Sequence, residues 1–346
     1  MHAAVERAAD TSQWGNPTGR LLPTANGESG GGDPVGQEDL SRPHRPRLPP
    51  DTVAKLRRQG ARRSARMAAM DSYVERPPLP GLAGVVRTVW IQRTGAAAYA
   101  QRHLPTGGVE MHFPIGGRPQ LVGPLTGPEI EIIPPRTTIV GVRFRPGTAP
   151  PLPAVLDDLV DQRLSLAELW GRSADRLVEA MARAETPERA LTGLQAHLLR
   201  EFRGAAHVDP LVREAVQALM PWHPVNIDAL ATHLALSASQ LRRRCLQAVG
   251  VSPKVLQRTL RFQGFLALAQ AGARSSGRPG ADGVAGLAVD VGYADQAHLS
   301  RECLRLTGLP PSRFLGGTVD RCACGHEHSA SYTPFLATRS RPPLRV

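Results

Sequence analysis

The chain has 346 residues, with 42 Lys and Arg against 30 Asp and Glu and a net charge of +12 at neutral pH. This basic balance favours polyanionic partners, and the length allows two or three domains of about 100 to 200 residues. No run approaches the roughly 20 apolar residues that span a bilayer, and the four cysteines do not form a disulfide framework. We therefore expect a cytoplasmic protein without a membrane partner.

Residues 1–70 are rich in Gly, Pro, Ser and Arg and show neither a helical nor a strand period. This composition predicts a disordered basic extension. Within it, the run KLRRQGARRSAR carries six basic residues and no acidic one. Such a run is typical of a DNA-binding arm and also of an ordinary solvated charge run.

Residues 71–205 are expected to form a β-rich domain with C-terminal helices. Short β-branched runs separated by Gly and Pro begin at residue 79: VVRTVWIQRT, VEMHFPI, PQLVG, EIEII and TTIVGVRFRPG. They predict a small antiparallel barrel or sandwich. Across residues 153–203 the apolar residues recur at spacings of three and four, which predicts helices.

Several polar residues of this domain invite a functional interpretation. His103, Glu110 and His112 are metal-ligand types, but they lack the spacing of a metal-cupin box, and strand alternation accounts for them. Arg143 and Arg145 alternate on a strand, so they share a face that meets either an anionic ligand or water. Paired carboxylates, an activated nucleophile or a phosphate loop are not visible at usable spacing. We expect no enzyme activity and no cofactor; a cupin-like enzyme with a helical appendage is the alternative.

Residues 206–317 are expected to form an all-α domain, which makes the whole chain α+β. Its first helix lies in DPLVREAVQALMP, with Asp209 as N-cap and Pro210 as the first helical residue. The stretch LRRRCLQAVGVSP at 241–253 then returns as LSRECLRLTGLPP at 299–311. The chain therefore contains the same helix twice.

Each copy is the second helix of a helix, tight turn, helix unit. In the first unit Asn226 caps IDALATHL, Ser237 starts the next helix with Gln240 in a capping box, and Gly250 ends it. The buried stripe expected there consists of Leu241, Cys245 and Ala248. In the second unit VAGLAVDVGY precedes a helix that begins at the cap Asp295 and ends at Gly308. The buried stripe expected there consists of Leu299, Cys303 and Leu306.

A long helix from Pro253 to Gly272 joins the two units. From Met220 to Gly316 there are eleven Lys and Arg against five Asp and Glu, and arginines lie opposite the apolar stripes. Two amphipathic hairpins packed in a bundle with solvated arginines would show the same stripes, but the charge favours DNA binding.

Residues 222–316 resemble the C-terminal DNA-binding domain of the AraC/XylS family of transcription regulators. The stretch LAVDVGYADQAHLSRECLRLTGLPPSRF fits the family pattern at Ala288, Gly292, Tyr293, Leu299, Arg301, Arg305, Gly308, Pro311 and Phe314. Leu299 and Cys303 replace the usual aromatic residues, and ARSSGRPGADG (273–283) lengthens the link to the second unit. The resemblance implies two helix-turn-helix units that read promoter DNA in consecutive major grooves, about 34 Å apart.

The exposed helix faces, together with this resemblance, give the expected DNA contacts. In the first unit they are Ser239, Gln240, Arg242, Arg243, Arg244 and Gln247, and in the second they are Gln296, His298, Arg301 and Arg305. We expect Arg243 and Gln240 to read sequence and Arg301 to anchor the second unit, since Arg pairs with guanine and Gln with adenine. RNA polymerase, a small-molecule effector and a second copy of the chain are further expected partners.

Residues 79–203 resemble one variant of the sensor domain of this family, through LPTGGVEMHFPIGG, VGVRFRPGTAP and LDDLVDQRLSLAELWG. The resemblance implies control of DNA binding by an N-terminal domain of unknown ligand. Residues 318–346 are expected to be a disordered tail. They contain CACGHEH, in which Cys322, Cys324, His326 and His328 are zinc or copper ligand types crowded onto one segment. We expect no metal there; a metal-responsive regulator acting through this tail is the alternative.

Overall fold

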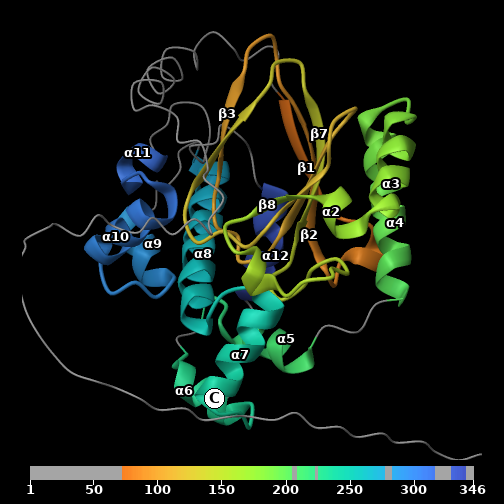
Figure 1. The fold of residues 1–346 in the computed structure, drawn as a ribbon. Coiled ribbons are helices and arrows are strands. Elements are labelled where there is room, and N and C mark those ends of the chain that lie inside the picture. Colours follow the sequence, from red (N-terminus) through yellow and green to blue (C-terminus); the bar gives the residue numbers. More distant parts are fainter. Residues whose placement is uncertain (1–71, 205–208, 223–224, 277–282, 316–328, 340–346) are drawn as a thin grey trace, which may run out of the picture. The chain divides into compact units, whose positions relative to one another are not determined.

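The computed structural model describes residues 72–204, 209–222, 225–276, 283–315 and 329–339 (Figure 1). Its strands are β1 (Ser72–Arg76), β2 (Val86–Arg93), β3 (Tyr99–His103), β4 (Glu110–Pro114), β5 (Gln120–Val122), β6 (Glu129–Ile133), β7 (Thr138–Phe144) and β8 (Arg163–Ser165). Its α-helices are α2 (Leu166–Trp170), α3 (Arg172–Ala182), α4 (Pro187–Gly204), α5 (Pro210–Ala218), α6 (Ile227–His233), α7 (Ala238–Val249), α8 (Pro253–Ser276), α9 (Val284–Asp290), α10 (Gln296–Thr307), α11 (Pro311–Leu315) and α12 (Ser329–Arg339). The expected extension at 1–70 lies outside the described residues.

The N-terminal domain is an antiparallel β-sandwich. A six-stranded sheet has the order β1-β2-β7-β4-β5-β8, and a two-stranded sheet pairs β3 with β6. Among the described residues all strand pairs are antiparallel. The five β-runs seen in the sequence correspond to β2, β4, β5, β6 and β7, whereas β1, β3 and β8 are additional strands.

The two faces of the six-stranded sheet differ in chemistry because successive side chains of a strand point to opposite faces. One face is apolar and packs against α3 and α4, which lie along the sheet in Figure 1. The other face carries Trp90 and polar side chains. Trp90 lies directly opposite Gly141, where a Cβ atom would come within 2.1 Å of the indole ring, so only glycine fits there.

The C-terminal domain has a continuous apolar core that extends from α5 to α12. Helix α8 has 24 residues and is therefore about 36 Å long at 1.5 Å per residue. It continues four residues beyond the expected end at Gly272. No helix among the described residues is long and apolar enough to cross a membrane.

Two expectations need correction. The predicted helical region at 153–203 includes the short 3₁₀ helix η2 (Leu156–Leu159) and strand β8, because β8 pairs with β5 at the edge of the sheet. The tail at 318–346 is not disordered throughout, because α12 folds against α8. Its Tyr332 and Phe335 are only 6% and 4% exposed. Burial of these two rings stabilises α12 against α8, which the composition of the tail does not indicate.

Candidate functional site

Helix α7 has the ends that its sequence predicts. The Ser237 side chain accepts a hydrogen bond from the Gln240 amide, and Gln240 Oε1 accepts one from the Ser237 amide at 2.8 Å. Gly250 ends the helix in the left-handed conformation at φ 83°. A Cβ atom at Gly250 would lie 2.6 Å from Pro124 and 2.7 Å from the Leu156 carbonyl oxygen, so this end of α7 packs closely against the β-domain.

The exposed side of α7 carries most of the residues expected to contact DNA: Ser239, Gln240, Arg242, Arg243 and Gln247. Within the part of the chain that the structure describes, Arg242 and Arg243 make no hydrogen bond or ion pair, so their guanidinium groups are available. Gln240 uses its carbonyl oxygen in the capping box, which competes with bidentate pairing to adenine. Arg244 is also engaged, because its Nη1 lies 2.6 Å from Asp209 Oδ2 on the α5 cap.

The buried side of α7 differs from the expectation at one position. Leu241 and Cys245 are fully buried, but Val249 completes the stripe at 1% exposure and Ala248 is only half-buried. A helix turns 100° per residue, so positions 248 and 249 both lie within about 60° of the direction midway between 241 and 245. Packing against neighbouring elements, rather than helical spacing, therefore decides which of the two is buried.

Helix α10 repeats this arrangement with a different surface. The Asp295 side chain accepts a 2.6 Å hydrogen bond from the His298 amide, and Gly308 ends the helix at φ 73°. The predicted stripe of Leu299, Cys303 and Leu306 is buried. Among the expected DNA contacts, Gln296, Arg301 and Arg305 are exposed. His298 is half-buried, with its ring edge-on to Tyr293 at 5.1 Å between centroids.

The two cysteines of the repeat serve packing. Cys245 and Cys303 are both 0% exposed and free of disulfide bonds. Burial raises the pKa of each thiol to about 11. At neutral pH both groups are therefore uncharged thiols that behave as small apolar side chains.

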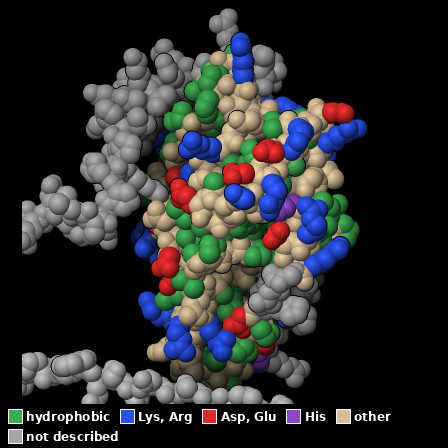
Figure 2. Space-filling view, turned by 45° about the vertical axis from the view of Figure 1, so that its right-hand side comes forward, with side chains coloured by type: hydrophobic (Ala, Val, Ile, Leu, Met, Phe, Trp, Pro, Cys, Tyr) green, Lys and Arg blue, Asp and Glu red, His purple; other side chains and the backbone are tan. Residues whose placement is uncertain are grey.

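Basic side chains are not confined to one patch. Figure 2 shows Lys and Arg side chains spread over one face of the molecule, with Asp and Glu among them. An open hollow of about 610 Å³ lies where α6 and α8 begin, and Lys254 and Arg261 line it. Charge alone therefore does not single out one nucleic-acid interface among the described residues.

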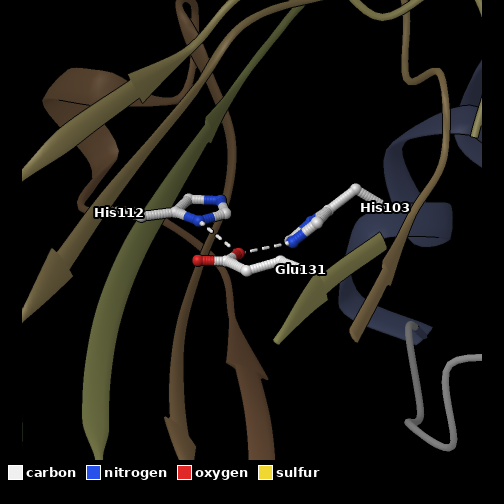
Figure 3. Close-up of side chains that lie close together, drawn as sticks. All are labelled: His103, His112 and Glu131. Atoms are coloured by element: carbon white, nitrogen blue, oxygen red, sulfur yellow. Dashed lines mark hydrogen bonds and ion pairs between the residues drawn. The ribbon is translucent and has the colours of Figure 1, made fainter. Parts of the chain in front are cut away.

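A second cluster of functional side chains lies between the two sheets of the β-domain. His103, His112 and Glu131 come from β3, β4 and β6 (Figure 3). His103 Nε2 lies 2.8 Å from Glu131 Oε2, and His112 Nδ1 lies 3.9 Å from the same oxygen. These three residues could hold a metal ion. Strand alternation does place Glu110 and His112 on one face, as expected, but that face is buried rather than solvated.

The electrostatics of this cluster follow from burial and its neighbours. Burial lowers the pKa of His112, although a hydrogen bond to Glu110 acts in the opposite direction. Burial by itself raises the pKa of Glu131, but the hydrogen bond from His103 and the nearby His112 and Arg163 bring it down to about 2. At neutral pH the cluster therefore contains a neutral His112 and an ionised Glu131.

Sequence reasoning missed Glu131 and Arg163 as members of this cluster. Glu131 lies in the run EIEII, which indicates a strand but not its partner. The pairing of β3 with β6 brings Glu131 opposite Gln101 and close to His103.

The expected interaction of Arg143 with water or an anionic ligand is replaced by ion pairs within the domain, because Arg143 binds Glu110 and Glu75 at 2.7 and 3.0 Å. The tail residues Cys322, Cys324, His326 and His328 lie outside the described residues.

Comparison with known proteins identifies two domains. Residues 230–316 match a helix-turn-helix domain family, and residues 74–165 match a domain of unknown function, DUF6597. No curated protein sequence matches the chain.

Structures of ToxT from Vibrio cholerae are similar to this chain at low identity. An apo variant of ToxT has 11% identity and a TM-score of 0.38, and covers 66% of this chain and 96% of its own. A second ToxT structure has 10% identity and a TM-score of 0.37, with 71% and 98% covered. A ToxT structure with bound unsaturated fatty acid has 9% identity and a TM-score of 0.34, with 76% and 99% covered. Because these scores are below 0.5, the likeness supports no conclusion on ligand or mechanism.

The two helix-turn-helix units and the family match define a DNA-binding transcription regulator. The C-terminal domain is of the AraC type, which confirms the resemblance seen in the sequence, and a β-rich domain precedes it.

Proposed function

We propose that α7 and α10 enter consecutive major grooves of promoter DNA and read it with unequal roles. One observation supports this proposal most strongly: the two equivalent helices each expose two arginines that bind no other described residue. They are Arg242 and Arg243 on α7, and Arg301 and Arg305 on α10. Arginine donates two hydrogen bonds to guanine in the major groove and also binds phosphate.

The linker supports the spacing of the two units. At about 36 Å, α8 is as long as one turn of B-DNA, which is about 34 Å. Arg258 of α8 forms an ion pair with Glu302 of α10 at 2.8 Å, and Gln257 donates a 2.8 Å hydrogen bond to the Val225 carbonyl oxygen ahead of α6. Both units are therefore attached to the same helix.

Within this proposal Arg243 contacts base edges, and Arg242 contacts a phosphate. Ser239, Gln247, Gln296, Arg301 and Arg305 are further contact residues. Arg244 has a smaller role because Asp209 holds it, and Gln240 has to leave its capping box to pair with adenine. His298 contributes through its exposed edge. RNA polymerase, a second copy of the chain and a location at the nucleoid belong to the same proposal.

The N-terminal domain controls DNA binding through its contacts with both recognition helices. Gly250 at the end of α7 packs on Pro124 and Leu156, and Arg102 of β3 donates a 2.7 Å hydrogen bond to the Thr307 carbonyl oxygen at the end of α10. Helix α12 adds a third connection. Arg87 of β2 donates to the Ser331 carbonyl oxygen at 2.7 Å and stacks over Phe335 at 4.5 Å. A change in the β-domain can therefore alter the relative positions of α7 and α10.

The test is selection of genomic DNA fragments by the full-length chain, followed by affinity measurements from about 50 to 200 mM salt. With six to ten phosphate contacts the affinity should fall by about 10³ to 10⁵ over this range. Arg242→Ala should reduce the salt slope by about one. Arg183→Ala, at the exposed C-cap of α3, is the matched control and should leave the slope unchanged. Binding without any preferred sequence would contradict the proposal.

A further inference from the structure

The space between the two sheets of the β-domain is lined by charged groups rather than by an apolar core. Four carboxylates and two guanidinium groups are linked there by ion pairs: Glu75, Glu110, Glu129, Glu131, Arg143 and Arg163. The buried Arg87 adds a third guanidinium group to this region: burial lowers its pKa to about 10, and the nearby Glu75 and Glu110 act in the opposite direction. It also donates hydrogen bonds to Gln263 and to the Ser331 carbonyl oxygen. Carboxylate and imidazole atoms that could bind a metal ion are thus gathered between the two sheets.

His112 is oriented as metal-binding histidines are. Its Nε2 faces Glu110 Oε2 at 3.4 Å, and Glu110 is in turn held by Arg143 Nε at 2.7 Å. This contact directs the other ring nitrogen, Nδ1, toward Glu131. A ligating histidine commonly donates its second ring N–H to a carboxylate, which fixes the tautomer and the ring orientation.

We propose that His103 Nε2, His112 Nδ1 and Glu131 Oε2 bind a divalent transition metal ion of the zinc class. All three atoms lie within 4.8 Å of one another, and Figure 3 shows the Glu131 carboxylate between the two imidazole rings. Ligand bonds of about 2.0 to 2.2 Å place neighbouring ligand atoms about 3.3 Å apart. The most distant pair therefore has to approach by up to about 1.5 Å, whereas His103 Nε2 and Glu131 Oε2, now 2.8 Å apart, have to separate by about 0.5 Å.

The donor set decides the class of metal. Two imidazoles and one carboxylate suit zinc and its transition-metal neighbours better than magnesium or calcium, which prefer oxygen ligands. Three protein ligands leave a fourth position for water or a small anion. The side chains of His103 and Glu131 are 12% and 23% exposed, so an ion can enter from their side, whereas His112 closes the inner end at 2%.

Arg163 competes with the metal ion for Glu131. Its Nη2 lies 3.1 Å from Glu131 Oε2, and its Nη1 lies 3.4 Å from His112 Nδ1. The Nη2 contact is not aligned as a hydrogen bond, although this nitrogen is buried. When the ion binds, Arg163 remains held by Gln120 at 3.0 Å and by Glu129 at 3.6 Å. Metal and Arg163 are thus alternative partners of one carboxylate.

The proposed ligands lie between residues 103 and 131, and the CACGHEH run lies at 322–328, so substitutions can address the two possible sources of bound metal separately. The full-length chain is prepared with the tail changes Cys322→Ser, Cys324→Ser, His326→Ala and His328→Ala, stripped with a chelator and titrated with Zn²⁺. Calorimetry and elemental analysis give affinity and stoichiometry. Variants in this background are His103→Ala, Glu131→Gln and Arg163→Gln, and His233→Ala on exposed α6 is the matched control.

The expected result is one Zn²⁺ per chain in the tail-substituted protein. Glu131→Gln and His103→Ala should weaken the affinity at least tenfold, His233→Ala should leave it unchanged, and Arg163→Gln should strengthen it severalfold because a competing cation is removed. Glu131→Gln is isosteric, so a folded variant is available even if His103→Ala destabilises the sandwich; circular dichroism checks this. Two results would overturn the proposal: stoichiometric Zn²⁺ binding by the unsubstituted chain that disappears in the tail-substituted chain, or a Zn²⁺ affinity that Glu131→Gln leaves unchanged. Weaker Zn²⁺ binding by Arg163→Gln would contradict the competition between Arg163 and the metal ion for Glu131.

Discussion

In the first helix-turn-helix unit α7 exposes two adjacent arginines, Arg242 and Arg243, that have no partner among the described residues. In the second unit α10 exposes Arg301 and Arg305, but the residue after Arg301 is Glu302, which is tied to Arg258 on the linker helix. Each unit also uses one charged side chain of its second helix to fix its position, but the sign differs: the first uses the cation Arg244, held by Asp209, and the second uses the anion Glu302, held by Arg258.

The positions that the two units share have a common physical role. Leu241 and Leu299 are both 0% exposed, and Gly250 and Gly308 both end a helix in the left-handed conformation. Leu304 on α10, at 54% exposure, stands where the first unit has the half-buried Leu246. Shared residues therefore build the scaffold, and differing residues give each unit its own surface; only Arg243 and Arg301 are both shared and exposed.

The strongest test of the shared scaffold is truncation of the two equivalent leucines. Leu241→Ala and Leu299→Ala should each cost about 2 to 5 kcal/mol of local stability, because both side chains are fully buried. Hydrogen exchange should show faster exchange in α6 and α7 for the first variant and in α9 and α10 for the second. Equal acceleration of both units by either variant would mean that they do not form separate scaffolds.

Smaller effects are expected at the helix N-termini, where the two units differ. Ser237→Ala removes a neutral cap and Asp295→Ala a charged one, each at a cost of about 0.5 to 2 kcal/mol. Asp295→Ala should cost more, because its carboxylate also interacts with the helix dipole. Urea unfolding at low and high salt separates the loss of the cap hydrogen bond from the loss of the interaction with the helix dipole, because salt screens only the latter. A larger cost for Ser237→Ala at low salt would disagree with this account.

Local signals in the sequence predicted much of the C-terminal domain. The caps Asp209, Asn226, Ser237 and Asp295 all accept the expected hydrogen bonds, since a cap depends on residues within one helical turn. Both C-terminal glycines were also predicted. One residue of the predicted buried stripes was wrong: Ala248 was expected where its neighbour Val249 is buried.

Long-range pairing explains what could not be predicted. Strands β3 and β8 are short, and among the described strands they pair with β6 and β5 alone, which lie far from them in the sequence. Arg143 looked like a surface residue because its strand alternates, yet β1 and α12 cover that face with Glu75 and Ser331. Glu131 was missed as a site residue for the same reason, since nothing near it in the sequence shows that β3 is its neighbour.

The two shared, exposed arginines, Arg243 and Arg301, are proposed to contact DNA with unequal roles. The most direct measurement compares the affinity of Arg243→Ala and Arg301→Ala for a selected DNA site and for a site with single-base changes, at physiological salt, with Arg189→Ala on exposed α4 as control. We expect Arg243→Ala to lose about 1 to 3 kcal/mol and to relax specificity at one base position, and Arg301→Ala to weaken binding uniformly across sequences. Unchanged site-specific affinity in both variants would contradict the account.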